Sequence, residues 1–278
     1  MKISCSNNFA IGETITERMA FVAESGFDAI ELVATPDQME EMLPEVINAK
    51  KSINLPVSAL CALHRGWLID PNPDARQAAM EDISRLIKLA GDVGAIGVFV
   101  IPILGYTIAL PGGPSTGRTQ DEDRELLANL LGELGRKAEK NGTKVLLEVI
   151  NRYESPIANR LSESATIIKA SGSKACQLHA DFFHMNIEES NLAEALYSTA
   201  DLLGYVHLAD SMRTYPGLGH TNYLELFRML VKIGYDGYVT VDAGDSRVHA
   251  GKILPNIVRY VRGMIGLAEE YNLLSQID

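Results

Sequence analysis

The feature of this sequence that most constrains its fold is an eightfold alternation between short apolar segments and longer amphipathic segments. The apolar segments are rich in Val, Ile and Leu and are bounded by Gly or polar residues, which is typical of parallel strands buried on both faces. Strands are therefore predicted over residues 2–6, 29–33, 57–62, 96–103, 144–150, 175–181, 205–208 and 238–242.

The amphipathic segments between these strands predict helices, because their apolar residues recur at helical spacing. The predicted helices span residues 14–25, 36–50, 74–92, 121–141, 161–171, 190–203, 221–233 and 250–274. A strand–helix unit repeated eight times is typical of a (β/α)8 TIM barrel, which needs about 250 residues. We expect a single TIM barrel domain of the α/β class over residues 1–278, with an open doubly wound sheet as the alternative.

A polar residue lies at or near the end of four predicted strands: Glu148, Asp181, His207 and Asp242. Side chains alternate between the two faces of a strand, and each of these four lies on the more polar face of its strand. The strands of a barrel surround one axis, so the four side chains would converge, whereas an open sheet would leave some of them far apart. Three carboxylates and one imidazole suit a hard or borderline divalent cation. The sequence therefore predicts a metal-dependent active site.

Structural interpretations compete with the metal interpretation for some of these residues. Glu148 could instead form an ion pair with Arg152, and a lone inward-facing histidine such as His207 is more often a hydrogen-bonded core residue. The coincidence with two further strand ends favours the metal interpretation. His179 is expected one layer below the site, where a hydrogen bond within the core is the preferred interpretation.

Several loops that follow the predicted strands carry further polar candidates. Glu154, His184 and Arg213 lie in such loops, where substrate contacts are usually made, and a solvated loop residue is the alternative for each. Glu31, on the second strand, is also expected to reach the mouth of the barrel. The segment 216–220, PGLGH, predicts a tight turn and lacks the features of a phosphate-binding loop.

The composition excludes several classes of partner. A formal net charge of −11 and a pI of about 5.1 argue against a nucleic-acid partner. The three cysteines lie in predicted strands and are expected to be reduced and buried, which favours a cytoplasmic protein. The N-terminus lacks an apolar signal segment, and no apolar stretch approaches the length of a membrane span.

At the candidate site the sequence resembles the ketose 3-epimerases of the D-tagatose/D-psicose type, within the xylose-isomerase-like barrel superfamily. The matching segments are LEVINRYE (147–154), DFFHMNIEE (181–189) and HLADSMRTYPGLG (207–219), and the resemblance follows the whole chain in order and spacing. It implies a small sugar as substrate and a homodimer or homotetramer. It also implies that Mn²⁺, or else Co²⁺ or Mg²⁺, is bound by Glu148, Asp181, His207 and Asp242, and that substrate oxygens are contacted by Glu154, His184 and Arg213.

The reaction implied by the resemblance is epimerisation of a ketose at C3. A proton leaves this carbon to give a cis-enediolate, and a proton returns on the opposite face, with Glu148 and Asp242 as the two acid/base groups. The family normally has a glutamate as its fourth ligand, and Asp242 is one methylene shorter. It must therefore move to reach a substrate carbon, and a displacement of about 1 Å can lower a rate about 10²-fold.

Other activities remain as alternatives. Aldose–ketose isomerisation, as in hydroxypyruvate isomerases, and dehydration of a keto-inositol use the same kind of site. The superfamily also includes apurinic-site endonucleases with three zinc ions, but these need more histidines and a basic face than six histidines and a charge of −11 provide. A non-catalytic sugar-binding barrel is the alternative if Asp242 has lost the function of a base.

Overall fold

A computed structural model describes residues 1–106, 115–243 and 250–274 of the chain. Eight parallel strands pair in sequence order, and β8 pairs with β1, which closes the sheet into a barrel. The predicted closed barrel is therefore confirmed, and the open-sheet alternative is wrong. The strands are β1 (Lys2–Ser6), β2 (Ala29–Ala34), β3 (Val57–Ala62), β4 (Gly97–Val100), β5 (Lys144–Glu148), β6 (Cys176–Asp181), β7 (Leu203–Leu208) and β8 (Tyr238–Val241).

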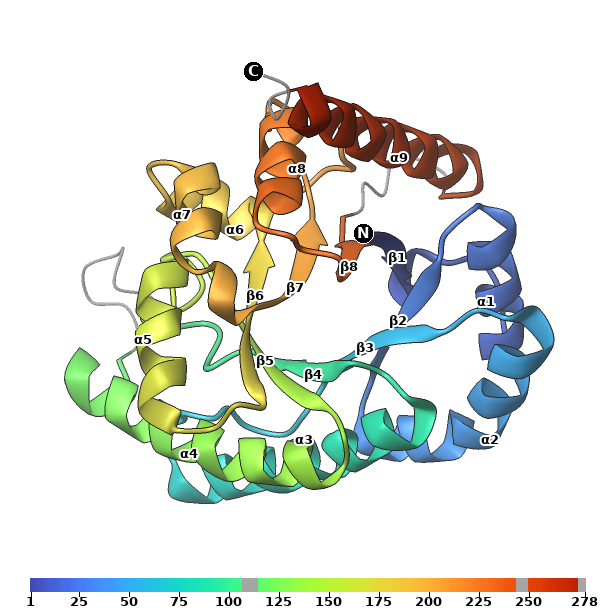
Figure 1. The fold of residues 1–278 in the computed structure, drawn as a ribbon. Helices are drawn as coiled ribbons and strands as arrows, with labels where there is room; N and C mark the ends of the chain where they lie inside the picture. The colour runs from blue at the N-terminus through green and yellow to red at the C-terminus, as the bar shows by residue number, and fades with distance from the viewer. Residues whose placement is uncertain (107–114, 244–249, 275–278) are drawn as a thin grey trace.

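Helices form an outer layer around the strands (Figure 1). The helices that follow strand-to-helix loops have their first turns at the same end of the barrel as the carboxyl ends of the strands. The α-helices are α1 (Ile15–Glu24), α2 (Pro36–Ile53), α3 (Pro73–Val93), α4 (Gln120–Lys140), α5 (Leu161–Ser171), α6 (Phe182–Glu188), α7 (Leu192–Ser198), α8 (Tyr223–Lys232) and α9 (Ala250–Leu274), and the short 3-10 helices are η1 (Asn7–Phe9) and η2 (Ala200–Leu202).

Local sequence signals explain where several helices begin and end. Three of them start with a capping box, in which a threonine side chain and the side chain three residues later cap one another's backbone amides. Left-handed residues, which cannot continue a helix, end α2 at Asn54, α3 at Gly94 and α5 at Gly172. The capping boxes are Thr14 with Glu17, Thr35 with Gln38, and Thr119 with Glu122.

The structure corrects several of the predicted elements. The continuous helix predicted over 190–203 is wrong, because α7 ends at Ser198, η2 follows, and β7 already begins at Leu203. Leu203 pairs with Leu178 of β6, so this residue belongs to the sheet and not to the predicted helix. The predicted strand over 96–103 is also too long, since β4 ends at Val100. Helix α6 was not predicted, because seven residues are too few to establish helical periodicity.

Two groups of side chains fill the two sides of the sheet. Apolar residues between the strands and the helices form the large core of the protein. A smaller cluster fills the lower part of the barrel and consists of Ala29, Ala59, Phe99, Leu146, Tyr205 and Tyr238. Within it, the Tyr205 hydroxyl lies 2.8 Å from Ser58 Oγ and accepts a hydrogen bond of 2.6 Å from Thr240 Oγ1. Burial raises the pKa of Tyr205 well above its usual value, so this hydroxyl stays neutral.

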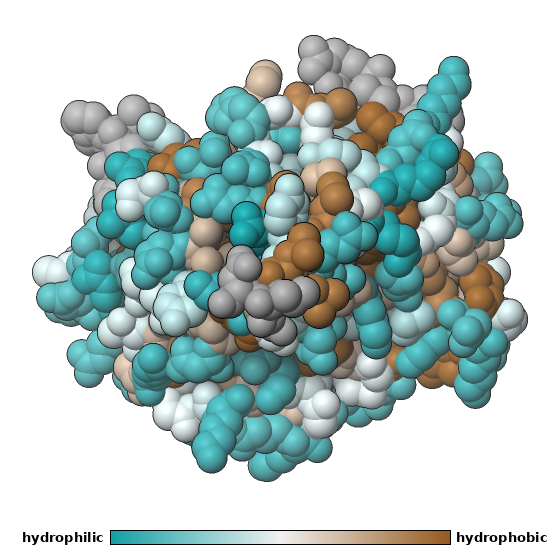
Figure 2. All heavy atoms as spheres, turned by 45° about the horizontal axis from the view of Figure 1, so that its top comes forward, coloured by the Kyte–Doolittle hydropathy of each residue, from teal (hydrophilic) through white to brown (hydrophobic). Residues whose placement is uncertain are grey.

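Two compositional expectations can be compared with the structure. All three cysteines are free thiols; Cys5 and Cys176 are buried as predicted, but Cys61 is only partly buried because it lies near the open end of the barrel. Among the described residues, no helix combines the length and the hydropathy that crossing a membrane requires. Hydrophilic and hydrophobic residues are interspersed on the face that Figure 2 shows.

Replacing Tyr205 with Phe should lower the free energy of unfolding by about 1–3 kcal/mol, because Ser58 and Thr240 lose a buried hydrogen-bond partner. Urea titration followed by circular dichroism measures this change. Tyr197→Phe is the matched control, since Tyr197 is 52% exposed and its ring contact with Lys232 does not need the hydroxyl. A loss at position 205 no larger than that of the control would contradict the proposed role of the hydroxyl.

Candidate active site

The barrel brings the four predicted metal-binding side chains together around the imidazole of His207. Nδ1 of His207 lies 3.6 Å from Glu148 Oε1, 3.7 Å from Asp181 Oδ2 and 3.6 Å from Asp242 Oδ2. The strands β5, β6 and β7 and the first residues after β8 supply one side chain each. The convergence follows from closure of the barrel, which turns the inward faces of these strands towards one axis.

The chemistry of this cluster fits a divalent cation. Distances of 3.6–3.7 Å are too long for hydrogen bonds, and both His207 Nδ1 and Asp181 Oδ2 are buried without a hydrogen-bond partner among the described residues. Ligand atoms that share one ion at about 2.1 Å lie about 3–4 Å apart. The ligand atoms of Asp181, His207 and Asp242 all lie within 4.8 Å of one another. A cation would satisfy the unpaired atoms and offset the concentrated negative charge.

Glu31 on β2 holds the other side of the His207 ring. Its Oε2 lies 2.8 Å from His207 Nε2, and the side chains are 0% and 1% exposed. A carboxylate on the remote nitrogen fixes the tautomer and orientation of a histidine that ligates metal through its other nitrogen. The sequence placed Glu31 near the mouth but did not predict this bond; its signal was an acidic residue inside an apolar strand.

Burial and neighbouring charges shift the pKa values of Glu148, Asp181 and His207 in different directions. Burial alone would raise the pKa of Asp181, but the charges of His184, His207 and Arg213 outweigh it and hold that pKa below its usual range. Burial likewise tends to lower the pKa of His207, but Glu31 and the neighbouring carboxylates raise it well above its usual value. Burial raises the pKa of Glu148, with His207 opposing the shift. Asp181 is therefore anionic, as a metal ligand must be.

The two oxygens of Asp181 have different partners. Oδ1 accepts hydrogen bonds from the backbone amides of Phe183 (2.7 Å) and His184 (3.2 Å), which caps the N-terminus of α6. Oδ2 is left facing His207. The cap fixes the orientation of the carboxylate and keeps one oxygen available for a cation.

The three predicted substrate-contacting residues lie beside the cluster and are linked to it. The predicted loop position of His184 is wrong, because α6, capped by Asp181, begins directly after β6 and includes this residue. Nη1 of Arg213 is 3.3 Å from His184 Nε2, and Nη2 is 3.4 Å from Asp242 Oδ2. Asn151, which the sequence did not single out, lies between His184 and Glu154: its Nδ2 is 2.8 Å from His184 Nδ1 and donates a 2.7 Å hydrogen bond to Glu154 Oε1. The structure thus places all three residues within one polar network at the mouth.

His179 differs from its prediction. Neither ring nitrogen has a hydrogen-bond partner among the described residues, so the expected core hydrogen bond is wrong. The ring instead packs edge-on against His207, with 4.0 Å between centroids, and against Phe99 and Tyr205. Burial lowers the pKa of His179 well below its usual value, so the ring is neutral. Together with Phe99 and Tyr205 it forms an aromatic floor beneath the cluster.

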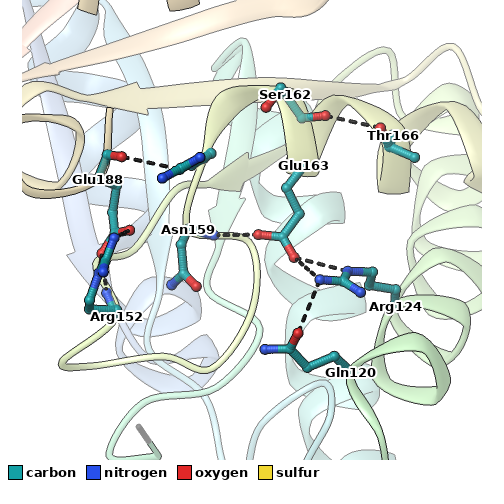
Figure 3. A pocket seen from close by; sticks show the side chains of 9 residues that line it. Gln120, Arg124, Arg152, Asn159, Ser162, Glu163, Thr166 and Glu188 are labelled. Carbon is teal, nitrogen blue, oxygen red and sulfur yellow. Dashed lines mark hydrogen bonds and ion pairs between the residues drawn. The ribbon is translucent and has the colours of Figure 1, made fainter. Parts of the chain in front are cut away.

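A separate cavity of about 790 Å³ opens between the first turns of α4 and α5 (Figure 3). Arg124 pairs with Glu163 at 2.9 Å, and Arg152 pairs with Glu188 of α6 at 2.7 Å. The second pair ties the β5–α5 loop to α6; Glu148, considered as the partner of Arg152, directs Oε1 towards His207 as described above. The cavity is lined by Gln120, Arg124, Arg152, Asn159, Arg160, Ser162, Glu163, Thr166 and Glu188, and so by none of the four predicted ligands.

Comparison with known families agrees with the fold. Residues 19–264 match the family described as "Xylose isomerase-like TIM barrel". The chain belongs to this family. The resemblance recognised in the sequence is therefore confirmed.

Several relatives of the chain are sugar epimerases. The chain is 36% identical over 244 residues to a 3-dehydro-D-guloside 4-epimerase of Escherichia coli (strain K12), covering 87% of this chain and 92% of the relative. It is 29% identical over 264 residues to a ketose 3-epimerase of Arthrobacter globiformis, covering 90% and 86%. The crystal structure of a 3-keto-D-glucoside 4-epimerase from E. coli superposes with a TM-score of 0.89 at 34% identity, covering 95% and 99%. These findings place the chain among the sugar epimerases of the family.

Glu31→Gln should weaken Mn²⁺ binding roughly 10- to 100-fold, because His207 loses the carboxylate that orients its ring. Isothermal titration calorimetry measures the affinity. Glu125→Gln, at an exposed position of α4, is the matched control and should bind Mn²⁺ as the wild type does. An unchanged affinity in Glu31→Gln would show that the contact between Glu31 and His207 does not support metal binding.

Proposed function

We propose that this chain is a divalent-metal-dependent epimerase that inverts a carbon next to the ketone of a sugar. The observation that carries the proposal is the set of three carboxylate oxygens around Nδ1 of His207. Within the described part of the chain, the buried atoms His207 Nδ1 and Asp181 Oδ2 have no hydrogen-bond partner. Glu148, Asp181, His207 and Asp242 would hold the ion, with Mn²⁺ the preferred candidate and Co²⁺ or Mg²⁺ as alternatives.

The bound metal would act as a Lewis acid that lowers the pKa of the carbon next to the ketone and stabilises negative charge on the substrate oxygens. Glu148 and Asp242 are the two acid/base groups in this proposal. Their strands, β5 and β8, are separated around the barrel by β6 and β7, so the two carboxylates approach the mouth from different sides. One removes the proton to form an enediolate, and the other returns a proton to the opposite face.

Arg213 and His184 would bind the oxygens of the substrate next to the reacting carbon. They lie 3.3 Å apart, and Arg213 has a further contact with Asp242, so a single sugar can reach all three. The guanidinium offers several donors in one plane, which suits adjacent sugar oxygens. Glu154, held by Asn151, would accept a hydrogen bond from a hydroxyl farther from the metal.

Asp242 is the most accessible member of the cluster, and this supports its role despite its short side chain. Its side chain is 20% exposed, whereas those of Glu148, Asp181 and His207 are 4%, 0% and 1% exposed. A carboxylate at the open edge of the cluster has room to turn between the metal and a substrate carbon. We therefore retain Asp242 as an acid/base group in the proposal.

Two positions on the sugar are compatible with this mechanism. Inversion at C3 of a free ketose is the first candidate. Inversion at C4 of a 3-keto glycoside is the second, and it is favoured by the similarity to the E. coli 4-epimerases. Both reactions remove a proton from a carbon next to a ketone. We also propose that the protein forms a homodimer or homotetramer and is located in the cytoplasm.

Incubation of the Mn²⁺-loaded protein with free ketoses and with 3-keto glycosides in D₂O tests the function. We expect deuterium at the inverted carbon, which NMR locates at C3 of a ketose or C4 of a glycoside. Deuterium at C1 or C2 with formation of an aldose would identify an aldose–ketose isomerase. Absence of deuterium from every sugar in the panel would refute the epimerase proposal.

Glu148→Gln should lower turnover by about 10²-fold or more, because the amide cannot accept a proton from carbon. It should weaken Mn²⁺ binding less than Asp181→Ala does, since the amide oxygen can still coordinate while alanine removes the ligand. Deuterium exchange measures the first effect and calorimetry measures the second. Full retained activity in Glu148→Gln would rule out the assignment of this residue.

A further inference from the structure

The loop between β7 and α8 is folded around one buried carboxylate, that of Asp210. Asp210 is 0% exposed and lies three positions after His207. Its Oδ1 accepts hydrogen bonds from the amides of Ser211 (2.8 Å) and Thr221 (3.0 Å), and its Oδ2 accepts one from the amide of Gly217 (2.9 Å). The donors come from the beginning, the middle and the end of the loop, so one carboxylate holds these three parts of the loop together.

The backbone of Asp210 also holds Arg213. The Asp210 carbonyl accepts a 2.7 Å hydrogen bond from the Arg213 amide, and the Asp210 amide donates a 2.8 Å bond to the Thr214 carbonyl. Within this turn, Arg213 adopts a φ of 55°, in the left-handed region that residues with side chains rarely occupy. A residue persists in such a conformation only when its surroundings enforce it, and this occurs most often at functional sites.

We propose that Asp210 is a positioning residue that aims the Arg213 guanidinium at the reacting part of the substrate. The carboxylate closes the loop, the closed loop keeps Arg213 in its left-handed conformation, and that conformation places Nη1 and Nη2 beside His184 and Asp242. This inference rests on the proposed function, in which Arg213, His184 and Asp242 contact the sugar.

An aspartate is required because the loop presents three N–H donors and an ionised carboxylate only accepts hydrogen bonds. Asparagine has nearly the same shape but would turn an NH₂ group towards at least one of these donors. A substitution at Gly219 offers a second, independent way to disturb the Asp210 carboxylate. A Cβ at position 219 would overlap Oδ1 and Cγ of Asp210, so alanine there must displace the carboxylate without changing the charge.

Asp210→Asn and Gly219→Ala should each lower kcat/KM by about 10²-fold, the effect expected from a displacement of about 1 Å in a group that orients substrate. Mn²⁺ affinity should stay within about twofold of wild type, because Glu31 orients the His207 imidazole through Nε2 independently of this loop. Asp236→Asn, at an exposed position, and Gly266→Ala, whose Cβ meets no atom within 4 Å, are the matched controls and should retain activity.

A double-mutant cycle separates positioning from a general structural role. If Asp210 acts through Arg213, Asp210→Asn should have little further effect on kcat/KM in a protein that already carries Arg213→Ala. Additive losses in the double variant, or a loss of Mn²⁺ affinity as large as the loss of kcat/KM, would overturn the proposal.

A second readout does not depend on catalysis. Release of the loop should expose the Arg213–Thr214 bond, so trypsin should cut there faster in Asp210→Asn and Gly219→Ala than in wild type, as mass spectrometry of the fragments detects. Equal rates of cleavage in variants and wild type would overturn the proposal. If the wild-type protein exchanges no deuterium with any sugar, the proposed function fails, while the trypsin comparison still decides whether Asp210 orders Arg213.

Discussion

Negative charge buried around one imidazole is the constraint on which the rest of the site depends. Glu31 contacts one nitrogen of His207, and Glu148, Asp181 and Asp242 surround the other. Carboxylates removed from water repel one another strongly unless cations or donors compensate them. The neighbouring features supply part of that compensation: the backbone amides at the start of α6 bind one oxygen of Asp181, and Arg213 approaches Asp242. The proposed divalent cation would supply the rest.

The fold and the convergence of the ligands could be predicted because both depend on short-range patterns. The alternation of side chains along a strand links Leu146 to Glu148 and Tyr205 to His207, so the polar residue of each pair had to follow the apolar one along the inward face. Once eight strand–helix units require closure, such residues must meet at the carboxyl ends. The pattern of each strand predicts which side chains face inward, and closure of the barrel predicts that these side chains meet.

The remaining features depend on contacts between distant segments or on elements too short to show a period. The bond between Glu31 and His207 joins residues 176 positions apart, and the register across several strands sets it. Helix α6 has seven residues and relies on the cap that Asp181 provides. Asn151 occupies its place because the loop after β5 meets helix α6 there. Among the described residues His179 has no hydrogen-bond partner, and the rings of Phe99, Tyr205 and His207 pack against it.

The aromatic floor formed by Phe99, His179 and Tyr205 has a consequence for the order of events in a reaction. Because these rings and the other side chains of the small cluster fill the lower barrel, a substrate of the proposed reaction would approach from the end of the barrel where the strands terminate. In the proposed reaction a sugar and its epimer would use the same opening, so each product would have to leave before the next substrate binds. The rate of product release past the loops at the mouth would then set an upper limit on turnover, separately from the rate of the chemical step.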